Sequence, residues 1–557
     1  MAQEMSKKLF VLGLDGATFD LIRPWVKEGL LPNIARFMRD GAWGELKSTL
    51  HPLSPPAWTS FMTGKNPGKH GIYDFVVHKP QSYELLYTHG GMRKGATLWK
   101  LLSDAGKKVI AVNVPMTYPP EAINGINISG FDAPGIDSDF IYPPRLYEEI
   151  QKDLGEYILR DYAQGHNPST FLNQIHATLD FQKKLMFYLM ERHEWDFYMM
   201  VFNAVDLVQH GYWQYMDESF TSISPEDRRQ YGNAIKDMYI KSDGIVGEVL
   251  AALPKDCDVL MLSDHGAGPC RKAVFMNKWL ETQGLLRYCS SGKGLSPLKL
   301  AHKGLKRVFS TKRLDWLKKT FPKLRQKVKS RLVFSEMDWQ NTKVYCFGRE
   351  STNLFINRKD RFPMGIVNPG KEYESLREVL IDKLMTLRDP ESGEPVVDKV
   401  FKNEEVYHGE CLDSAPDLLV TWKNSEYTSW PGYSDRNHSI FESSLEHSDF
   451  NEWSSLQKGG NHRPNGIFMV NGDMVNSNHE LFGSEIIDVA PTVLFMMDVP
   501  IPSDMDGKIV TSAFKPAYIQ SRCPEFCEAG VSQSPMFNYT EEQAMQIEER
   551  LRSLGYI

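Results

Sequence analysis

Short apolar runs, each closed by a small or acidic residue, constrain the fold of this 557-residue chain more than any other feature. A run in which nearly every residue is apolar is typical of a strand buried on both faces, as in a largely parallel sheet. Because such strands cannot leave one face in water, helices must cover both sides of the sheet. The runs are residues 9–14, 108–114, 197–201, 258–263 and 466–470.

Helical patterns lie between these runs. Residues 168–194 repeat apolar side chains at helical spacing, and Asn167 followed by Pro168 fits an N-cap and a proline in the first helical position. Residues 225–253 show a similar pattern. Strands that alternate with helices predict a doubly wound α/β fold with right-handed crossovers.

The alternation is interrupted in the second half of the chain, which predicts an insertion. We expect the core to be formed by residues 1–275 and 411–520, with residues 276–410 as an inserted cap. Residues 521–557 form a C-terminal tail that ends in a helix. Thr540 and Gln543 have the spacing of a capping box, so this last helix should begin there.

Charge is distributed unevenly along the chain. The net charge of −7 argues against a globally basic nucleic-acid-binding protein. Residues 293–331 nevertheless hold 14 lysines and arginines against the single acid Asp315, with apolar residues recurring at helical spacing. This stretch predicts basic amphipathic helices in the cap, which attract an anionic substrate, lipid headgroup or nucleic acid. The alternative is an ordinary solvated cationic face.

The cellular setting follows from what the sequence lacks. No apolar run reaches the ~18 residues of a membrane-spanning helix. The N-terminal apolar run ends at Asp15 with no cleavage site typical of a signal peptide. Seven widely spaced cysteines do not suggest a disulfide framework. We therefore expect a cytoplasmic protein without a transmembrane segment, with peripheral contact at a membrane surface as an alternative. The oligomeric state stays open.

Acidic residues and histidines follow three of the predicted strands. Asp15 follows the first, Asp206 and His210 the third, and Asp264 and His265 the fourth. Because the carboxyl ends of parallel strands meet at one edge of a sheet, these side chains should converge. Three carboxylates buried together would repel one another, and divalent cations relieve that repulsion.

A further histidine is expected near this group. His462 lies in the glycine-rich segment 459–466, just before a predicted strand. The flanking glycines let the backbone approach a metal closely, so we prefer His462 over His438 and His447, which compete in the same region.

A hydroxyl that could act as nucleophile lies in residues 55–64. Thr59 stands where a loop enters a helix, and a helix N-terminus favours anions and an ionised hydroxyl beside a metal. The alternative is that Thr59 only caps the helix.

These motifs resemble the alkaline phosphatase superfamily, and within it the type I phosphodiesterase/nucleotide pyrophosphatase branch. The resemblance covers residues 8–275 and 410–515, and the insertion and tail resemble a group of predicted phosphohydrolases and phosphomutases. It implies a three-layer α/β/α sandwich with a largely parallel central sheet and an inserted cap. The motifs that carry it are Gly13-Leu14-Asp15-Gly16, residues 56–64 and 67–72, Asp206-x-x-x-His210, Ser263-Asp264-His265-Gly266, His462 and residues 487–494 with Asp506-Gly507.

The resemblance also implies the roles of the site residues. One divalent cation would be held by Asp206, His210 and His462, and the other by Asp15, Asp264 and His265, with Thr59 bridging them as the nucleophile. Nitrogen and carboxylate ligands suit Zn²⁺ best, and Mn²⁺ or Fe²⁺ are alternatives. A phospho-threonine intermediate would then be hydrolysed.

The sequence departs from the branch at one position. These phosphodiesterases carry an asparagine after the nucleophile that holds a phosphate oxygen, and this chain has no unambiguous match. Lys65, Asn66 and Lys69 are candidates for that substrate-binding role, and the alternative is that they are turn or surface residues. A sulfatase is disfavoured because its formylglycine signature is absent. A monoesterase that binds phosphate with an arginine beside the nucleophile is also disfavoured, because no arginine falls between residues 40 and 92.

Three functions remain open at this point. The first is a two-metal phosphohydrolase acting on a phosphorylated small molecule, nucleotide or lipid-linked sugar phosphate. The second is a phosphomutase or phosphotransferase that passes the phosphoryl group to a second hydroxyl. The third is a non-enzymatic protein that binds anionic surfaces. Aromatic residues between 422 and 453 either stack a base or sugar, or pack a long loop.

Overall fold

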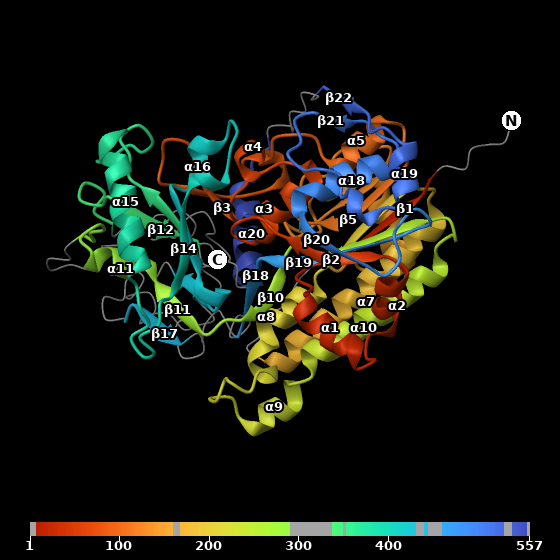
Figure 1. Cartoon of the computed structure of the whole chain (residues 1–557), viewed down its shortest axis with the longest axis horizontal. Helices are drawn as coiled ribbons and strands as arrows, with labels where there is room; N and C mark the ends of the chain where they lie inside the picture. The colour runs from red at the N-terminus through yellow and green to blue at the C-terminus, as the bar shows by residue number, and fades with distance from the viewer. Residues whose placement is uncertain are drawn as a thin grey trace.

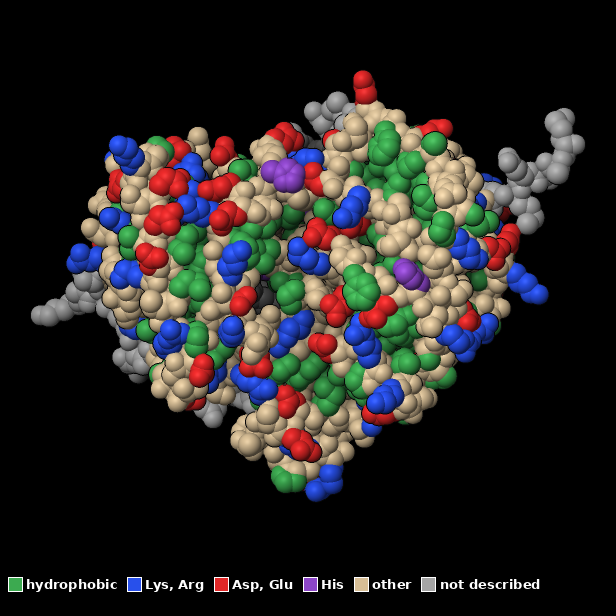
Figure 2. Space-filling model, in the orientation of Figure 1, with side chains coloured by type: hydrophobic (Ala, Val, Ile, Leu, Met, Phe, Trp, Pro, Cys, Tyr) green, Lys and Arg blue, Asp and Glu red, His purple; other side chains and the backbone are tan. Residues whose placement is uncertain are grey.

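A nine-stranded sheet forms the centre of the larger of two lobes in the computed structural model (Figure 1). The structure describes residues 7–159, 167–289, 337–348, 352–430, 439–443, 459–528 and 537–553. The basic stretch 293–331 therefore lies outside the described residues, as do His438 and His447. Figure 2 shows acidic and basic side chains mixed over the viewed face of both lobes.

The sheet is mostly parallel, as predicted. Its order is β20-β2-β19-β9-β1-β8-β5-β6-β7, and its five adjacent strands from β9 to β6 all run parallel. Strand β19 is antiparallel to both neighbours. The strands are β1 (Leu9–Leu14), β2 (Ala42–Lys47), β5 (Val109–Val114), β6 (Gly125–Ser129), β7 (Ile141–Tyr142), β8 (Phe197–Phe202), β9 (Asp258–Leu262), β19 (Asn465–Asn471) and β20 (His479–Glu485).

Helices cover both faces of this sheet. Phe10 and Leu12 of β1 pack into one apolar core, whereas Leu9 and Val11 pack into a second core on the opposite face. Each buried side chain of this size contributes about 1.5–3 kcal/mol. The three-layer α/β/α architecture is therefore confirmed. One face carries α1 (Phe19–Lys27), α2 (Pro32–Asp40), α7 (Pro168–Arg192), α8 (Ala204–Met216) and α10 (Ala234–Ala252), and the other α3 (Ser54–Thr63), α5 (Leu98–Asp104), α18 (Val489–Met496) and α19 (Pro516–Ser521).

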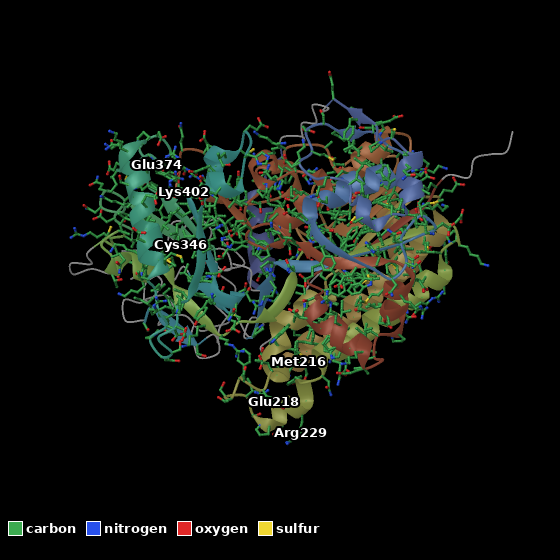
Figure 3. The ribbon with its side chains drawn as sticks, in the orientation of Figure 1. Met216, Glu218, Arg229, Cys346, Glu374 and Lys402 are labelled. Carbon is green, nitrogen blue, oxygen red and sulfur yellow. The ribbon has the colours of Figure 1, made fainter. Side chains whose placement is uncertain are left out.

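The predicted helix over residues 225–253 is divided in the structure. The first part, α9 (Pro225–Tyr231), ends at Gly232, whose amide donates to the carbonyl of Arg228. Helix α10 begins two residues later. Glu218 and Arg229 label this region in Figure 3, where α9 projects beyond the sheet.

The smaller lobe is built on a four-stranded sheet of order β12-β13-β15-β14. Helix α15 (Lys371–Met385) packs on it, and Lys402 of β14 lies 3.7 Å from the Glu374 carboxylate of this helix (Figure 3). Strand β15 lies after residue 410, so this sheet contains chain beyond the predicted end of the cap. The domain boundaries themselves stay a prediction. The strands are β12 (Val344–Phe347), β13 (Asn353–Ile356), β14 (Val397–Lys402) and β15 (Leu418–Trp422).

The C-terminal tail returns to the larger lobe. Helix α20 (Glu541–Ser553) begins with the predicted capping box, in which the Gln543 amide donates to Thr540 Oγ1 over 3.2 Å and the Thr540 amide donates to Gln543 Oε1 over 3.0 Å. Arg550 donates to the carbonyls of residues 131, 133 and 134. Among the described residues, no helix combines the length and apolar character needed to cross a bilayer.

Candidate metal centre

Six buried acids and histidines meet at the carboxyl edge of the central sheet, each with at most 3% of its surface exposed. Three strands end at this point and deliver five of them, as the sequence predicts. The six residues are Asp15 after β1, Asp206 and His210 in the first turns of α8 after β8, Asp264 and His265 after β9, and His462.

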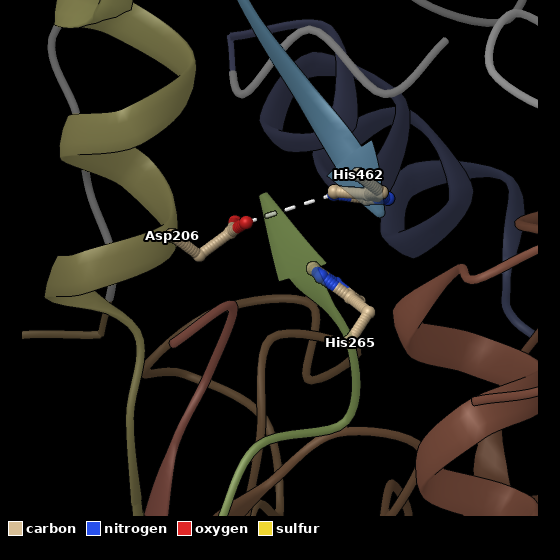
Figure 4. A group of neighbouring side chains, drawn as sticks. All are labelled: Asp206, His265 and His462. Carbon is tan, nitrogen blue, oxygen red and sulfur yellow. Dashed lines mark ion pairs between the residues drawn. The ribbon is translucent and has the colours of Figure 1, made fainter. Parts of the chain in front are cut away.

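His462 reaches the group through a separate strand pair. Strand β18 (Gly460–Arg463) pairs antiparallel with β10 (Gly266–Pro269), and His462 lies opposite Ala267 in the register. This pairing places the His462 ring 3.7 Å from the His265 ring, measured between centroids. Figure 4 shows both imidazoles and the Asp206 carboxylate pointing toward one another from three separate segments of the chain.

The first predicted ligand set is close enough to hold one ion. Asp206 Oδ1 lies 3.2 Å from His210 Nε2 and 3.6 Å from His462 Nε2, and the two imidazole nitrogens are 2.8 Å apart. One ion could contact these three atoms together, because metal–ligand bonds in such sites are about 2.0–2.2 Å.

The second predicted set lies beside the first. His265 Nε2 is 3.3 Å from Asp264 Oδ2 and 3.7 Å from Asp15 Oδ1. The ligand atoms of these three residues all lie within 4.8 Å of one another, and the same limit holds for Asp206, His265 and His462. His265 therefore lies between the two sets.

The electrostatics of the cluster favour cations. Burial, together with the Asp206 charge, raises the pKa of the Asp264 carboxyl to about 7. Burial would also raise the pKa of Asp206, but His210 and His462 together hold it well below its usual range. Burial, aided by His462, lowers the pKa of His265 to about 4, so its imidazole is neutral near pH 7. Divalent cations would stabilise the ionised carboxylates.

The tautomer of His265 fits a metal ligand. His265 Nδ1 lies 3.0 Å from the carbonyl oxygen of Gly266, which can only accept, so Nδ1 carries the proton and donates. The lone pair of Nε2 then faces Asp15 and Asp264. Asp264 Oδ2 is fully buried and receives no hydrogen bond from the residues that the structure describes. The donor set of carboxylate oxygens and imidazole nitrogens thus fits Zn²⁺ or a similar divalent ion.

A second hydroxyl of α3, that of Ser54, contacts this cluster. Ser54 is the first residue of α3, is 1% exposed, and its Oγ lies 3.4 Å from His265 Nε2. Thr59 lies farther along α3, where its hydroxyl donates to the carbonyl of Pro55 over 2.7 Å. The nucleophilic role of Thr59 stays a prediction. The sequence feature that could have identified Ser54 as the start of α3 is its position before Pro55-Pro56, since proline favours the first turn of a helix.

Lys65, Asn66 and Lys69 contact a different set of acids. The Lys65 ammonium pairs with Asp504, and the Lys69 ammonium lies 2.5 Å from Asp506 Oδ1. The backbone amide and side-chain amide of Asn66 both donate to Asp506 over 2.9 Å. These contacts join residues 65–69, which follow α3, to residues 504–506. They favour the structural alternative over the predicted substrate-binding role.

The aromatic segment shows local packing where it is described. The Trp422 indole donates to Thr352 Oγ1 over 2.9 Å, and the Tyr427 hydroxyl donates to Asp389 Oδ2 over 3.1 Å. Both contacts lie within the smaller lobe. Tyr433 and Trp453 lie outside the described residues.

Comparison with known proteins places this geometry in context. A family model described as "Type I phosphodiesterase / nucleotide pyrophosphatase" matches residues 9–436. No curated protein matches the chain.

The solved structures that are similar to the chain include the following two. The structure of phosphonoacetate hydrolase from Sinorhizobium meliloti 1021 in complex with phosphonoformate has 15% sequence identity and a TM-score of 0.51, over 88% of this chain and 95% of that chain. The structure of human ectonucleotide pyrophosphatase/phosphodiesterase 5 has 12% sequence identity and a TM-score of 0.47, over 88% of this chain and 95% of that chain. The first of these likenesses supports the same fold.

Proposed function

The chain belongs to the type I phosphodiesterase/nucleotide pyrophosphatase family and is a phosphoric ester hydrolase, and from this premise we propose that it cleaves phosphodiester or pyrophosphate bonds at a two-metal site. The observation that carries the proposal is the convergence of the six buried ligands in two adjoining sets. The proposed substrate is a phosphorylated small molecule, a nucleotide or a lipid-linked sugar phosphate.

The ligands have a defined part in this reaction. When bound, two divalent cations lower the pKa of a nearby hydroxyl and neutralise the charge of the phosphate. Asp15, Asp264 and His265 would hold one of them, and Asp206, His210 and His462 the other. We favour zinc because of the mixed nitrogen and carboxylate donors.

We propose Ser54, in place of Thr59, as the nucleophile. Its Oγ forms the bond to phosphorus, the bond to the leaving-group oxygen breaks, and the serine proton ends on that oxygen. Water then attacks the phosphoserine and restores the Ser54 hydroxyl. The N-terminus of α3 favours the phosphate group through the helix dipole. The position of Ser54 beside His265 supports this assignment.

The test measures the activity of two alanine variants and of the wild type, each reconstituted with metal. Ser54→Ala should lose on the order of 10³-fold or more in kcat on bis-p-nitrophenyl phosphate while it keeps its metal content. Thr59→Ala is the matched control in the same helix, and it should keep activity within about tenfold. The reverse result would restore Thr59 as the nucleophile. If both variants keep full activity, a phosphoenzyme at this helix is excluded.

The same assay addresses the finer parts of the proposal. A panel of diesters, nucleotides, sugar phosphates and phospholipids ranks the substrates, and an added alcohol acceptor detects transfer instead of hydrolysis. Metal analysis of the purified protein tests zinc. We also propose a cytoplasmic location, since the cysteines form no disulfide among the described residues. Cell fractionation tests that location.

A further inference from the structure

Two buried asparagines connect the sheet interior to one of the proposed metal ligands. The Asn203 side-chain amide donates to Asp15 Oδ2 over 2.7 Å. The Asn113 side-chain amide in turn donates to Asn203 Oδ1 over 2.9 Å and to the carbonyl of Val201 over 2.6 Å. Asn203 is 2% exposed and Asn113 is 6% exposed. The two side chains thus form a buried hydrogen-bonded chain that ends at Asp15.

The orientation of the two side-chain amides is determined by the acceptors at both ends of this row of hydrogen bonds. The Asp15 carboxylate can only accept, so Asn203 must turn its NH₂ group toward it and its oxygen toward Asn113. The Val201 carbonyl can also only accept, so Asn113 must present its NH₂ group to both acceptors. Neither amide can rotate by 180° without placing two acceptors against each other in a buried site, which costs about 1–3 kcal/mol.

The backbone at Asn113 is shaped for this contact. Asn113 has φ +58°, a left-handed conformation that asparagine tolerates better than most residues. The pairing of β5 with β6 is interrupted between Val112 and Val114, so Asn113 lies at an irregularity of the strand. Such irregularities re-aim a side chain. Here the Asn113 side chain points back to the carbonyl of the neighbouring strand β8 and to Asn203.

The geometry assigns Asn113 and Asn203 as positioning residues that hold Asp15 ready to bind a divalent cation. With Oδ2 bound by Asn203, Asp15 Oδ1 is the oxygen that lies 3.7 Å from His265 Nε2, in the second ligand set. Hydrogen bonds of this kind orient metal ligands, and their loss costs about 10–100-fold in metal affinity. The inference rests on the proposed function, because it concerns the same metal site.

Two substitutions at Asn113 separate this role from simple packing. In Asn113→Asp, a carboxylate replaces the donor, and Asn203 can donate to it only by rotating its NH₂ group toward residue 113 and turning its oxygen toward Asp15. Asn113→Gly is the matched control. It accepts the left-handed backbone and leaves Asn203 free to keep donating to Asp15. The hydrogen bonds of the Asn113 side chain go to Val201 and Asn203, so its hydrogen-bonding effect on metal binding passes through Asn203.

The sign of the effect is diagnostic. An added negative charge near the site would by itself strengthen cation binding. Rotation of the Asn203 amide, which turns its oxygen toward Asp15, weakens cation binding instead. We therefore expect Asn113→Asp to weaken the binding of one of two Zn²⁺ ions by about 10–100-fold. We expect Asn113→Gly to weaken the binding of that same ion by less than about tenfold.

The experiment is calorimetric titration of metal-free wild-type and variant protein with Zn²⁺, with thermal melting of the metal-free proteins beside it. Unchanged or tighter binding of both ions by Asn113→Asp overturns the inference, even if the wild type hydrolyses diesters. A purely structural role would lower the Tm of both metal-free variants and leave both affinities unchanged, which also overturns it. Wild-type protein that binds no divalent cation would overturn the proposed two-metal function and this inference together.

Discussion

Replacement of the proposed ligand Asp264 by asparagine should stabilise the metal-free protein. Burial and the Asp206 charge raise the pKa of Asp264 from 3.8 to about 7 in the folded state. A raised folded pKa means that the folded protein binds this proton more tightly than the unfolded chain. The stabilising effect is complete below about pH 4 and is lost as the pH rises to about 7.

The magnitude follows from the size of that shift. Each pKa unit corresponds to about 1.36 kcal/mol, so a shift of about three units costs about 4 kcal/mol once Asp264 is ionised. Water that enters the metal-free site reduces the cost, and we expect about 2 kcal/mol at about pH 8. Asparagine mimics the protonated acid, because its oxygen can accept from the Gly16 amide and its NH₂ group can donate to His265 Nε2.

The assay is urea unfolding in a chelating buffer between about pH 5 and pH 8. Asp264→Asn should exceed the wild type in stability by about 2 kcal/mol at about pH 8, and the difference should shrink toward about pH 5. Asp382→Asn, on the exposed side of α15, is the matched control and should change little. With saturating Zn²⁺ the order should reverse, because only the wild type binds both ions tightly.

The reasoning is refuted if metal-free Asp264→Asn is less stable than the wild type at about pH 8. A difference that does not change with pH would refute it as well, because it would show that ionisation of Asp264 is not the cause.

Two further predictions concern stability away from the metal centre. Burial would raise the pKa of Asp506, but Lys69 and Asn66 lower it to about 2, so its stabilising effect is present above about pH 4 and lost toward about pH 2. Asp506→Asn should therefore lose about 1–2 kcal/mol at neutral pH in urea unfolding, and equal stability at neutral pH would contradict this. Arg550→Ala should release the C-terminal helix, because three carbonyls lose their donor. Limited proteolysis should then cleave this tail faster than in the wild type, and an unchanged rate would show that other contacts hold the tail.

The central sheet and the meeting of the six proposed ligands could be predicted because they depend on strong local patterns. Asp15 and Asp264 each follow a continuously apolar strand, and strands of that kind share one edge of a parallel sheet. The prediction of His462 depended on flanking glycines, and the β10–β18 pairing brings it beside His265. Their identity as metal ligands remains a prediction.

Other features depend on contacts that no local pattern encodes. The proximity of Ser54 to His265 depends on where α3 begins, and residue motifs locate helix starts only approximately. Lys69 and Asn66 resemble phosphate-binding residues in sequence, yet they contact Asp506 from a segment more than 400 residues away. The contact between Asn113 and Asn203 requires a local irregularity of β5, which a hydrophobic pattern does not reveal.

The strand order of the larger lobe has a consequence for synthesis. The first strand, β1, lies between β8 and β9, and β19 joins the sheet only after the smaller lobe has been translated. During translation, Asp15 is synthesised more than 400 residues before His462. Until then, β9 lacks its antiparallel neighbour and the centre lacks one histidine. Capture of the full complement of metal would thus report that translation has passed the smaller lobe and that both parts of the larger lobe have assembled.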